Sequence, residues 1–237
     1  MGLWNIFSRD EQAALKKHAQ RVANKRSQAP DRWESIHALA AMRSSEAIDA
    51  LLVRFTYTTD PSITDQEEKD AVFDAVVQAK DVALEPVRRF LSRAESLGWP
   101  LKLLQSILSP QDVLSELLRL LGKMDTEYER DPQRKIQVLA ALEERQDPRI
   151  AEAAQLFLDD VNETVRFHAV GALLAQDDAV QSKDPLLQAL IKEESVRVRL
   201  RILDGFAQHQ WSVGPSAKSL KLPPAYRLDT KGVPRKS

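Results

Sequence analysis

One feature constrains the fold of this chain more than any other: an apolar triplet at positions i, i+3 and i+6 recurs along it. Residues three or four apart lie on one side of an α-helix, so each triplet predicts a helix with one apolar face. Successive triplets are separated by 37, 28, 35, 31 and 33 residues. The triplets are Ile36/Leu39/Met42, Phe73/Val76/Ala79, Leu101/Leu104/Ile107, Ile136/Leu139/Leu142, Phe167/Val170/Leu173 and Leu200/Leu203/Phe206.

The last three copies of this pattern are the clearest. Residues 165–173 superpose on residues 198–206 at an offset of 33, and residues 135–142 fall on 166–173 at an offset of 31. Small residues between the apolar positions, such as Ala140, Ala169 and Gly171, leave room for neighbouring helices to approach closely. The chain is therefore expected to repeat one structural unit.

A second helix is expected to follow each triplet helix. Ser109, Asp147 and Asp184 each precede a proline, which is typical of a helix start because the side chain accepts an orphan amide and proline is tolerated there. Asp131 before Pro132 marks a first helix in the same way. The second helices are predicted at 47–55, 85–94, 111–121, 149–158 and 186–192. Residues 56–68 and 123–130 are predicted to be polar loops.

Two amphipathic helices per 33 residues cannot bury their apolar faces alone, so such hairpins must stack on their neighbours. The predicted fold is all-α: a right-handed α-solenoid of about six helical hairpins. Only 7 glycines and 6% aromatic residues agree with helix rather than strand. We expect an N-terminal capping helix in residues 1–30, the repeats in residues 31–211, and an irregular, basic, proline-containing tail in residues 212–237.

The segment 160–173, with its weaker copy 194–200, gives the chain a resemblance to bacterial HEAT-repeat proteins, an armadillo-like family. The resemblance covers residues 131–210 well and 31–122 loosely. It implies HEAT-like hairpins but says almost nothing about function, because such arrays serve many unrelated tasks. Our first hypothesis for function is a protein–protein interaction scaffold. It also implies a ladder between repeats, made by an acidic residue before the first helix and an arginine inside it, here Asp160 and Arg166.

Charge is distributed unevenly along the chain. Residues 1–32 carry a net charge of +4 and residues 212–237 a net charge of +5, so residues 33–211 carry −10. An acidic body disfavours binding to duplex DNA, which requires cationic contacts to phosphates. A HEAT-like DNA glycosylase, to which Trp33, Trp99 and Trp211 point, is therefore the less favoured alternative, and Trp99-Pro100 is expected in a hairpin turn.

Several kinds of chemistry lack the residues they need. The chain has no cysteine, its 4 histidines form no metal-binding pair, and its glycines form no phosphate loop. We therefore expect no catalytic residue, no cofactor and no metal, and a protein that is not an enzyme. A HEAT-like enzyme or a lyase-type chaperone, such as the phycobilin lyases, remains the alternative. The apolar run at the N-terminus is too short for a signal peptide or a membrane span, and a cytoplasmic protein is expected.

A protein or peptide is the expected partner. The candidate partner-binding residues are Trp4, Phe7, Arg197, Arg201 and Trp211. Trp4 and Phe7 either cap the end of the stack or contact a partner or membrane surface. The basic tail, with Leu220, Leu222 and Tyr226 as apolar contacts, either docks on the acidic body and competes with the partner or remains solvated.

Overall fold

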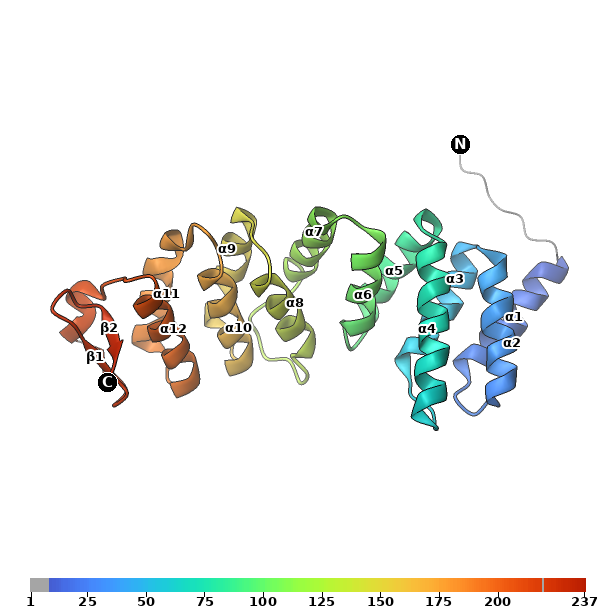
Figure 1. Cartoon of the computed structure of the whole chain (residues 1–237), viewed down its shortest axis with the longest axis horizontal. Coiled ribbons are helices and arrows are strands. Elements are labelled where there is room, and N and C mark those ends of the chain that lie inside the picture. Colours follow the sequence, from blue (N-terminus) through green and yellow to red (C-terminus); the bar gives the residue numbers. More distant parts are fainter. Residues whose placement is uncertain (1–8, 219) are drawn as a thin grey trace. The chain divides into compact units, whose positions relative to one another are not determined.

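The computed structural model describes residues 9–218 and 220–237, and within these ranges the chain is mostly α-helical (Figure 1). The all-α prediction is confirmed. The chain divides into two compact units, unit 1 (residues 1–113) and unit 2 (residues 114–237). Unit 1 contains α1 (Arg9–Ala23), α2 (Ala29–Met42), α3 (Ser45–Leu52), the 3₁₀-helix η1 (Val53–Thr56), α4 (Ser62–Gln78), α5 (Asp81–Arg93) and α6 (Gly98–Ile107). The boundary falls inside α7 (Pro110–Leu121).

Unit 1 is built in two layers of helices. The triplet helices α2, α4 and α6 pack against one another in order, and α3 packs against α5 beside them. Helix α1 packs on α2 and α3. The core between the layers is fully buried at Leu39, Leu51, Val76 and Val87. Each apolar stripe is thus covered by the hairpin next to it.

Unit 2 repeats this arrangement. Its triplet helices α8, α10 and α12 pack in a row, and the buried residues Leu139, Val170 and Leu203 come from the predicted triplets (Figure 1). Its elements are α8 (Gln133–Glu143), α9 (Pro148–Gln155), the 3₁₀-helix η2 (Leu156–Asp159), α10 (Glu163–Leu174), the 3₁₀-helix η3 (Ala179–Ser182), α11 (Lys183–Lys192), α12 (Val196–Gln208), the 3₁₀-helix η4 (Gly214–Lys218), β1 (Tyr226–Leu228) and β2 (Pro234–Lys236).

The predicted helix starts are confirmed at three of the four acceptor–proline pairs. Ser109 Oγ accepts from the Asp112 amide at 3.2 Å, Asp131 Oδ1 from the Gln133 amide at 3.1 Å, and Asp147 Oδ1 from the Arg149 amide at 3.0 Å. The prediction for Asp184 was wrong, because η3 runs directly into α11 and places Asp184 inside the first turn.

Two predicted irregular segments also differ from the structure. Helix α4 begins at Ser62, so the second half of the loop predicted at 56–68 is helical. Trp99 and Pro100 lie in the first turn of α6, a position where proline is tolerated, rather than in a hairpin turn. The predicted interruption at 123–130 is confirmed as a non-helical connection.

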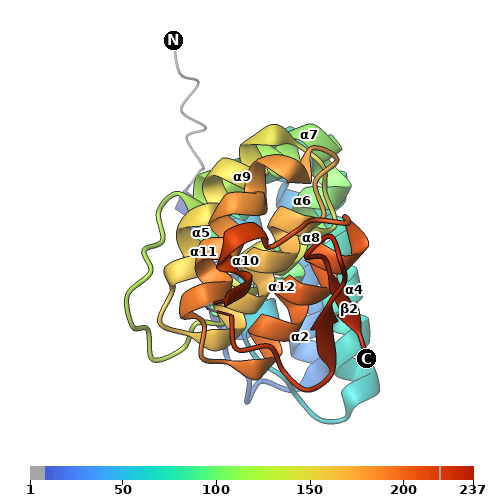
Figure 2. The same ribbon diagram turned by 90° about the vertical axis from the view of Figure 1, so that its left-hand side faces the viewer.

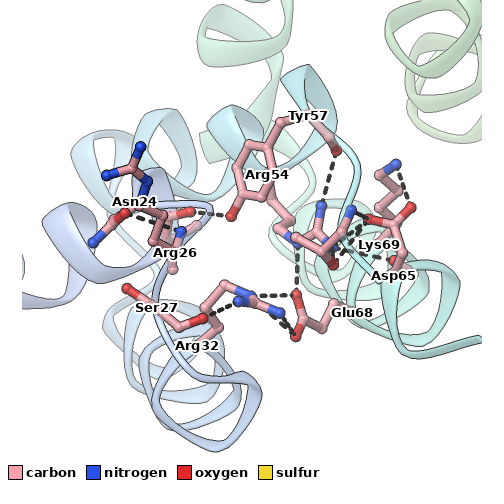
Figure 3. A network of polar contacts seen from close by, with 11 residues as sticks. Asn24, Arg26, Ser27, Arg32, Arg54, Tyr57, Asp65, Glu68 and Lys69 are labelled. Atoms are coloured by element: carbon pink, nitrogen blue, oxygen red, sulfur yellow. Dashed lines mark hydrogen bonds and ion pairs between the residues drawn. The ribbon is translucent and has the colours of Figure 1, made fainter. Parts of the chain in front are cut away.

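Five charged side chains inside unit 1 form a buried network (Figure 3). Arg54, fully buried, donates from Nε to Glu68 at 2.7 Å and from Nη2 to Asp65 at 2.7 Å. Arg32 donates to both oxygens of Glu68, at 2.9 and 3.0 Å. Lys69 Nζ donates to the second oxygen of Asp65 at 2.7 Å. Removing one member of such a set leaves a buried charge uncompensated, at a cost of about 3–5 kcal/mol.

The network also holds the connections between helices. Arg54 Nη1 donates to the Tyr57 carbonyl at 3.1 Å, and the Thr59 amide donates to Asp65 at 2.9 Å, which fixes the chain between η1 and α4. Arg32 donates to the Ser27 carbonyl between α1 and α2. Because Arg54 itself lies in η1, the network determines where that short helix sits against α4.

The C-terminal tail contains a small hairpin in place of a wholly irregular chain. Strands β1 and β2 pair antiparallel, with Tyr226 opposite Lys236 and Leu228 opposite Pro234. Strand β2 packs on α12 (Figure 2). Tyr226 and Val233 are buried, so the hairpin closes over the last helix of unit 2.

The burial of Leu139 generates a stability prediction. Replacing Leu139 by alanine leaves a cavity between α8 and its neighbours and should lower the free energy of unfolding by about 2–5 kcal/mol. The exposed Glu152→Ala variant in α9 should change it by less than about 0.5 kcal/mol. Urea unfolding followed by circular dichroism measures both, and equal effects would show that the repeat register is misassigned.

The buried network predicts a dependence on pH. Burial raises the pKa of Asp65, but hydrogen bonds from Lys69, Arg54 and the Thr59 amide outweigh this and lower it to about 2. The folded chain therefore binds fewer protons than the unfolded chain between pH 4 and 2, and stability present above pH 4 is lost as the pH falls through that window.

The test compares the pH slope of the free energy of unfolding in wild type and in Asp65→Asn. The wild-type slope between pH 4 and 2 should be steeper by up to about 1.4 kcal/mol per pH unit, the value for one proton. The exposed Asp74→Asn variant on the same helix should keep the wild-type slope. Identical slopes in wild type and Asp65→Asn would contradict the role assigned to this carboxylate.

Candidate functional site

Helices α10 and α12 of unit 2 begin at equivalent positions. Asn162 Oδ1 accepts from the Thr164 amide at 2.9 Å and the Val165 amide at 3.2 Å, and Ser195 Oγ accepts from the Val198 amide at 3.4 Å. These caps set the register of the two helices, which pack against each other. Residues 33 apart in the sequence are therefore neighbours along this face of unit 2.

Two arginines of α12 stack on one aromatic ring of α10. The guanidinium carbons of Arg197 and Arg201 each lie 3.9 Å from the centroid of the Phe167 ring. Their spacing of four residues puts both on one face of α12. A guanidinium over an aromatic face is stabilised by the ring quadrupole and retains its hydrogen-bond donors at the edge.

Arg201 is further held by a carboxylate from α8. Its Nη2 lies 2.5 Å from Glu143 Oε2, and the other oxygen of Glu143 lies 2.5 Å from His168 Nδ1. The Arg201–Glu143 ion pair crosses α10 at Gly171. A Cβ added to Gly171 would lie 2.1 Å from the Arg201 guanidinium and 2.5 Å from the Glu143 carboxyl carbon. Only glycine leaves room for this crossing. Glu143 is partly buried at the centre of these contacts.

A groove of about 580 Å³ lies over this arrangement. It is lined by Phe167, Val196, Arg197, Leu200, Arg201 and Asp204. Val196 is 61% exposed, so its apolar surface faces solvent. The Arg197 side chain is about half exposed, and its polar contacts within the described residues are long, 4.0 Å to Glu163 and 3.5 Å to Thr164 Oγ1. We call this surface the arginine groove.

An ion-pair ladder runs along unit 2 beside the arginine groove. Lys135 of α8 contacts Asp160, which precedes α10, at 3.1 Å, and Arg166 of α10 contacts Glu193, which precedes α12, at 2.7 Å. Burial raises the pKa of Glu193, but hydrogen bonds from Arg166 and the Ser195 amide lower it overall. The expected residues Asp160 and Arg166 both take part in the ladder, but their side chains do not pair with each other. The Asp160 carboxylate binds Lys135, whereas Arg166 binds Glu193 and contacts Asp160 through its backbone carbonyl.

The C-terminal tail contacts Arg199, the residue at the next position of the ladder. Arg199 is equivalent to Lys135 and Arg166 in the repeat, and it donates to the Lys221 carbonyl of the tail. Tyr226 donates its hydroxyl to Asp204, and Lys236 Nζ lies 2.7 Å from the same carboxylate. Of the two alternatives for the tail, these contacts correspond to docking on the body. Its competition with a partner stays a prediction.

The other candidate residues lie elsewhere. Trp211 is 9% exposed and packs edge-on against Phe206 at 5.4 Å and flat against His209 at 4.5 Å, so it belongs to the core rather than to the arginine groove. Trp4 and Phe7 lie outside the described residues. Phe167 was missed as a site residue, because the sequence presents it only as the first apolar position of a triplet.

The two carboxylates in and next to the arginine groove are already paired. The carboxylate of Glu143 already accepts from Arg201 and His168, and Asp204 is occupied by Tyr226 and Lys236. What the groove presents to solvent is the exposed guanidinium of Arg197 beside apolar Val196 and Leu200. This combination matches a ligand with a carboxylate next to apolar side chains.

Gly171 generates a prediction about the groove. Gly171→Ala should displace the Arg201–Glu143 pair and lower the free energy of unfolding by about 1–3 kcal/mol, as overpacking does. The control is Gly98→Ala, where the nearest atom to an added Cβ is 3.8 Å away and the effect should stay within about 1 kcal/mol of wild type. Thermal unfolding measures both variants. A Gly171→Ala protein as stable as Gly98→Ala would contradict the close crossing.

Further findings bear on function. No helix in the described ranges is both long and apolar enough to cross a membrane. In the same residues, no group of three histidine, aspartate or glutamate side chains is placed to hold a metal ion. Comparisons of the chain with protein-family models, with curated proteins and with solved structures find no match.

Proposed function

We propose that this chain is a HEAT-like interaction scaffold, without catalytic activity or cofactor, that binds a protein or peptide segment in the arginine groove of unit 2. The observation that carries the proposal is the pairing of a half-exposed guanidinium, Arg197, with exposed apolar surface at Val196. The expected segment is acidic and carries an aliphatic or aromatic side chain next to its carboxylate.

The repeat organisation supports the scaffold part of the proposal. Within each unit the triplet helices pack in order, and in unit 2 the Lys135–Asp160 contact recurs as Arg166–Glu193 one repeat later. Hairpins related by such a repeating contact are characteristic of solenoids, whose repeats contact only their neighbours. We accordingly propose a right-handed solenoid of about six hairpins in a cytoplasmic, bacterial protein.

The geometry of the groove supports the binding part. Arg197 is positioned by its stacking on Phe167, so little side-chain freedom is lost when a carboxylate binds to it. Arg201 keeps the Phe167 ring in place while its own charge is satisfied by Glu143. The groove is thus a prearranged surface with a single cation open to a partner.

The experiment is capture of proteins from a native lysate by the immobilised full chain, with quantification by mass spectrometry. A stoichiometric partner should be retained by wild type and lost at least about tenfold with Arg197→Glu, because a carboxylate would then face the partner's own. Retention should also decrease as salt rises, since exposed charges are screened.

Arg130→Glu provides the matched control. It makes the same change in net charge at an exposed position in the 123–130 connection, away from the arginine groove, and should retain the partner as wild type does. If Arg197→Glu retained the partner equally well, the groove would not be its binding site. If wild type retained no protein in stoichiometric amount, the scaffold proposal itself would fail.

A further inference from the structure

A second cavity lies in unit 1, between η1, the end of α5 and the first turn of α6, and is independent of the arginine groove. Its volume is about 470 Å³, within the range of small-molecule sites. The residues that matter for its chemistry are Phe55, Phe90, Arg93, Glu95, Ser96 and Trp99. We call it the aromatic pocket.

The walls of the aromatic pocket are rings. Phe55 stacks on Trp99 with 4.5 Å between centroids and 24° between planes, and Phe90 lies 6.2 Å from Phe55. With Phe73, which contacts Trp99, they bring together three of the chain's 7 phenylalanines and one of its 4 tryptophans. The pocket opens to solvent at the exposed residues Arg93, Glu95 and Ser96, and these rings form its apolar wall.

The aromatic pocket is also held in a fixed shape. Phe55 directly follows Arg54, whose guanidinium is bound by Glu68 and Asp65 inside the network of Figure 3. Val53 and Phe55, on either side of this fixed residue, both line the cavity. The wall contributed by η1 is therefore in place before any ligand arrives, which reduces the entropy that binding must overcome.

The charge at the pocket mouth favours an anion. Arg93 is exposed and, among the described residues, makes no ion pair or side-chain hydrogen bond. A second cation, Lys102, places its Nζ 4.7 Å from the Trp99 ring centroid. Glu95 is the single carboxylate that lines the cavity. The N-cap residue of α6, Leu97, has no side chain that could accept a hydrogen bond from the start of the helix. The Gly98 amide donates a long hydrogen bond, 3.5 Å, to Ser96 Oγ. The positive end of that helix adds to the attraction for a carboxylate.

We propose that the aromatic pocket binds a small aromatic carboxylate, with its ring against Phe55, Phe90 and Trp99 and its carboxylate on Arg93. A guanidinium that lacks a protein partner beside a ring-lined cavity provides both the charge and the apolar surface that such a ligand needs. The opposite charge of Glu95 weakens this attraction, and Lys102, which lies over the Trp99 ring but does not line the cavity, adds a positive charge nearby.

The test uses isothermal titration of the full chain with N-acetyl-L-tryptophan and, as the uncharged counterpart with the same ring, N-acetyl-L-tryptophanamide. Wild type should bind the acid at a single site at least about tenfold more tightly than the amide, equivalent to about 1.4 kcal/mol. Arg93→Gln should remove this preference while leaving amide binding unchanged. Glu95→Gln should increase the preference for the acid, because the carboxylate that repels the acid is gone.

Arg130→Gln, an equal loss of charge in unit 2, should bind both probes as wild type does. Circular dichroism of each variant establishes that it is folded before titration. Absence of saturable binding of the acid to wild type would overturn the proposal, and so would an acid-to-amide ratio that Arg93→Gln leaves unchanged. Neither outcome bears on the proposal for the arginine groove, because none of the substituted residues lines that groove.

Discussion

The burial of Arg54 is the constraint on which unit 1 depends. A guanidinium without access to water is tolerated only when its charge and donors are satisfied, and here Glu68 and Asp65 provide that satisfaction. Glu68 is fully buried in turn and also binds Arg32, so α2, η1 and α4 share one carboxylate (Figure 3). Apolar packing brings these three elements together, and the charged residues fix their relative position.

Unit 2 uses charge in a more regular way. Each internal triplet helix places a cation next to the carboxylate that precedes the following triplet helix, first Lys135 with Asp160 and then Arg166 with Glu193. Arg199, at the same position of the last repeat, donates instead to the Lys221 carbonyl of the tail, while its Nε finds no partner among the described residues. The tail therefore takes the place of a further repeat, and the arginine groove lies beside it.

The repeat could be predicted from the sequence because its apolar positions are regular, and Leu139 and Leu203 are buried where the triplets place them. Residues 62–68 could not be predicted as helix, because Asp65 and Glu68 are turned inward toward arginines that lie 11 to 36 positions away in the chain. Hydrophobic periodicity carries no signal for a buried charge. The aromatic pocket was missed for a similar reason, since Phe55, Phe90 and Trp99 come from three elements and meet only in the fold.

The hairpin of β1 and β2 has a consequence for self-association. A row of packed helices ends in a helix whose outer face has no neighbour, and in repeat proteins such a face adheres to other molecules unless a polar cap covers it. Here Tyr226 and Val233 are buried beside α12, while Lys236 and Arg227 face solvent on the hairpin. The hairpin therefore covers apolar surface of α12 and presents cationic side chains to solvent in its place.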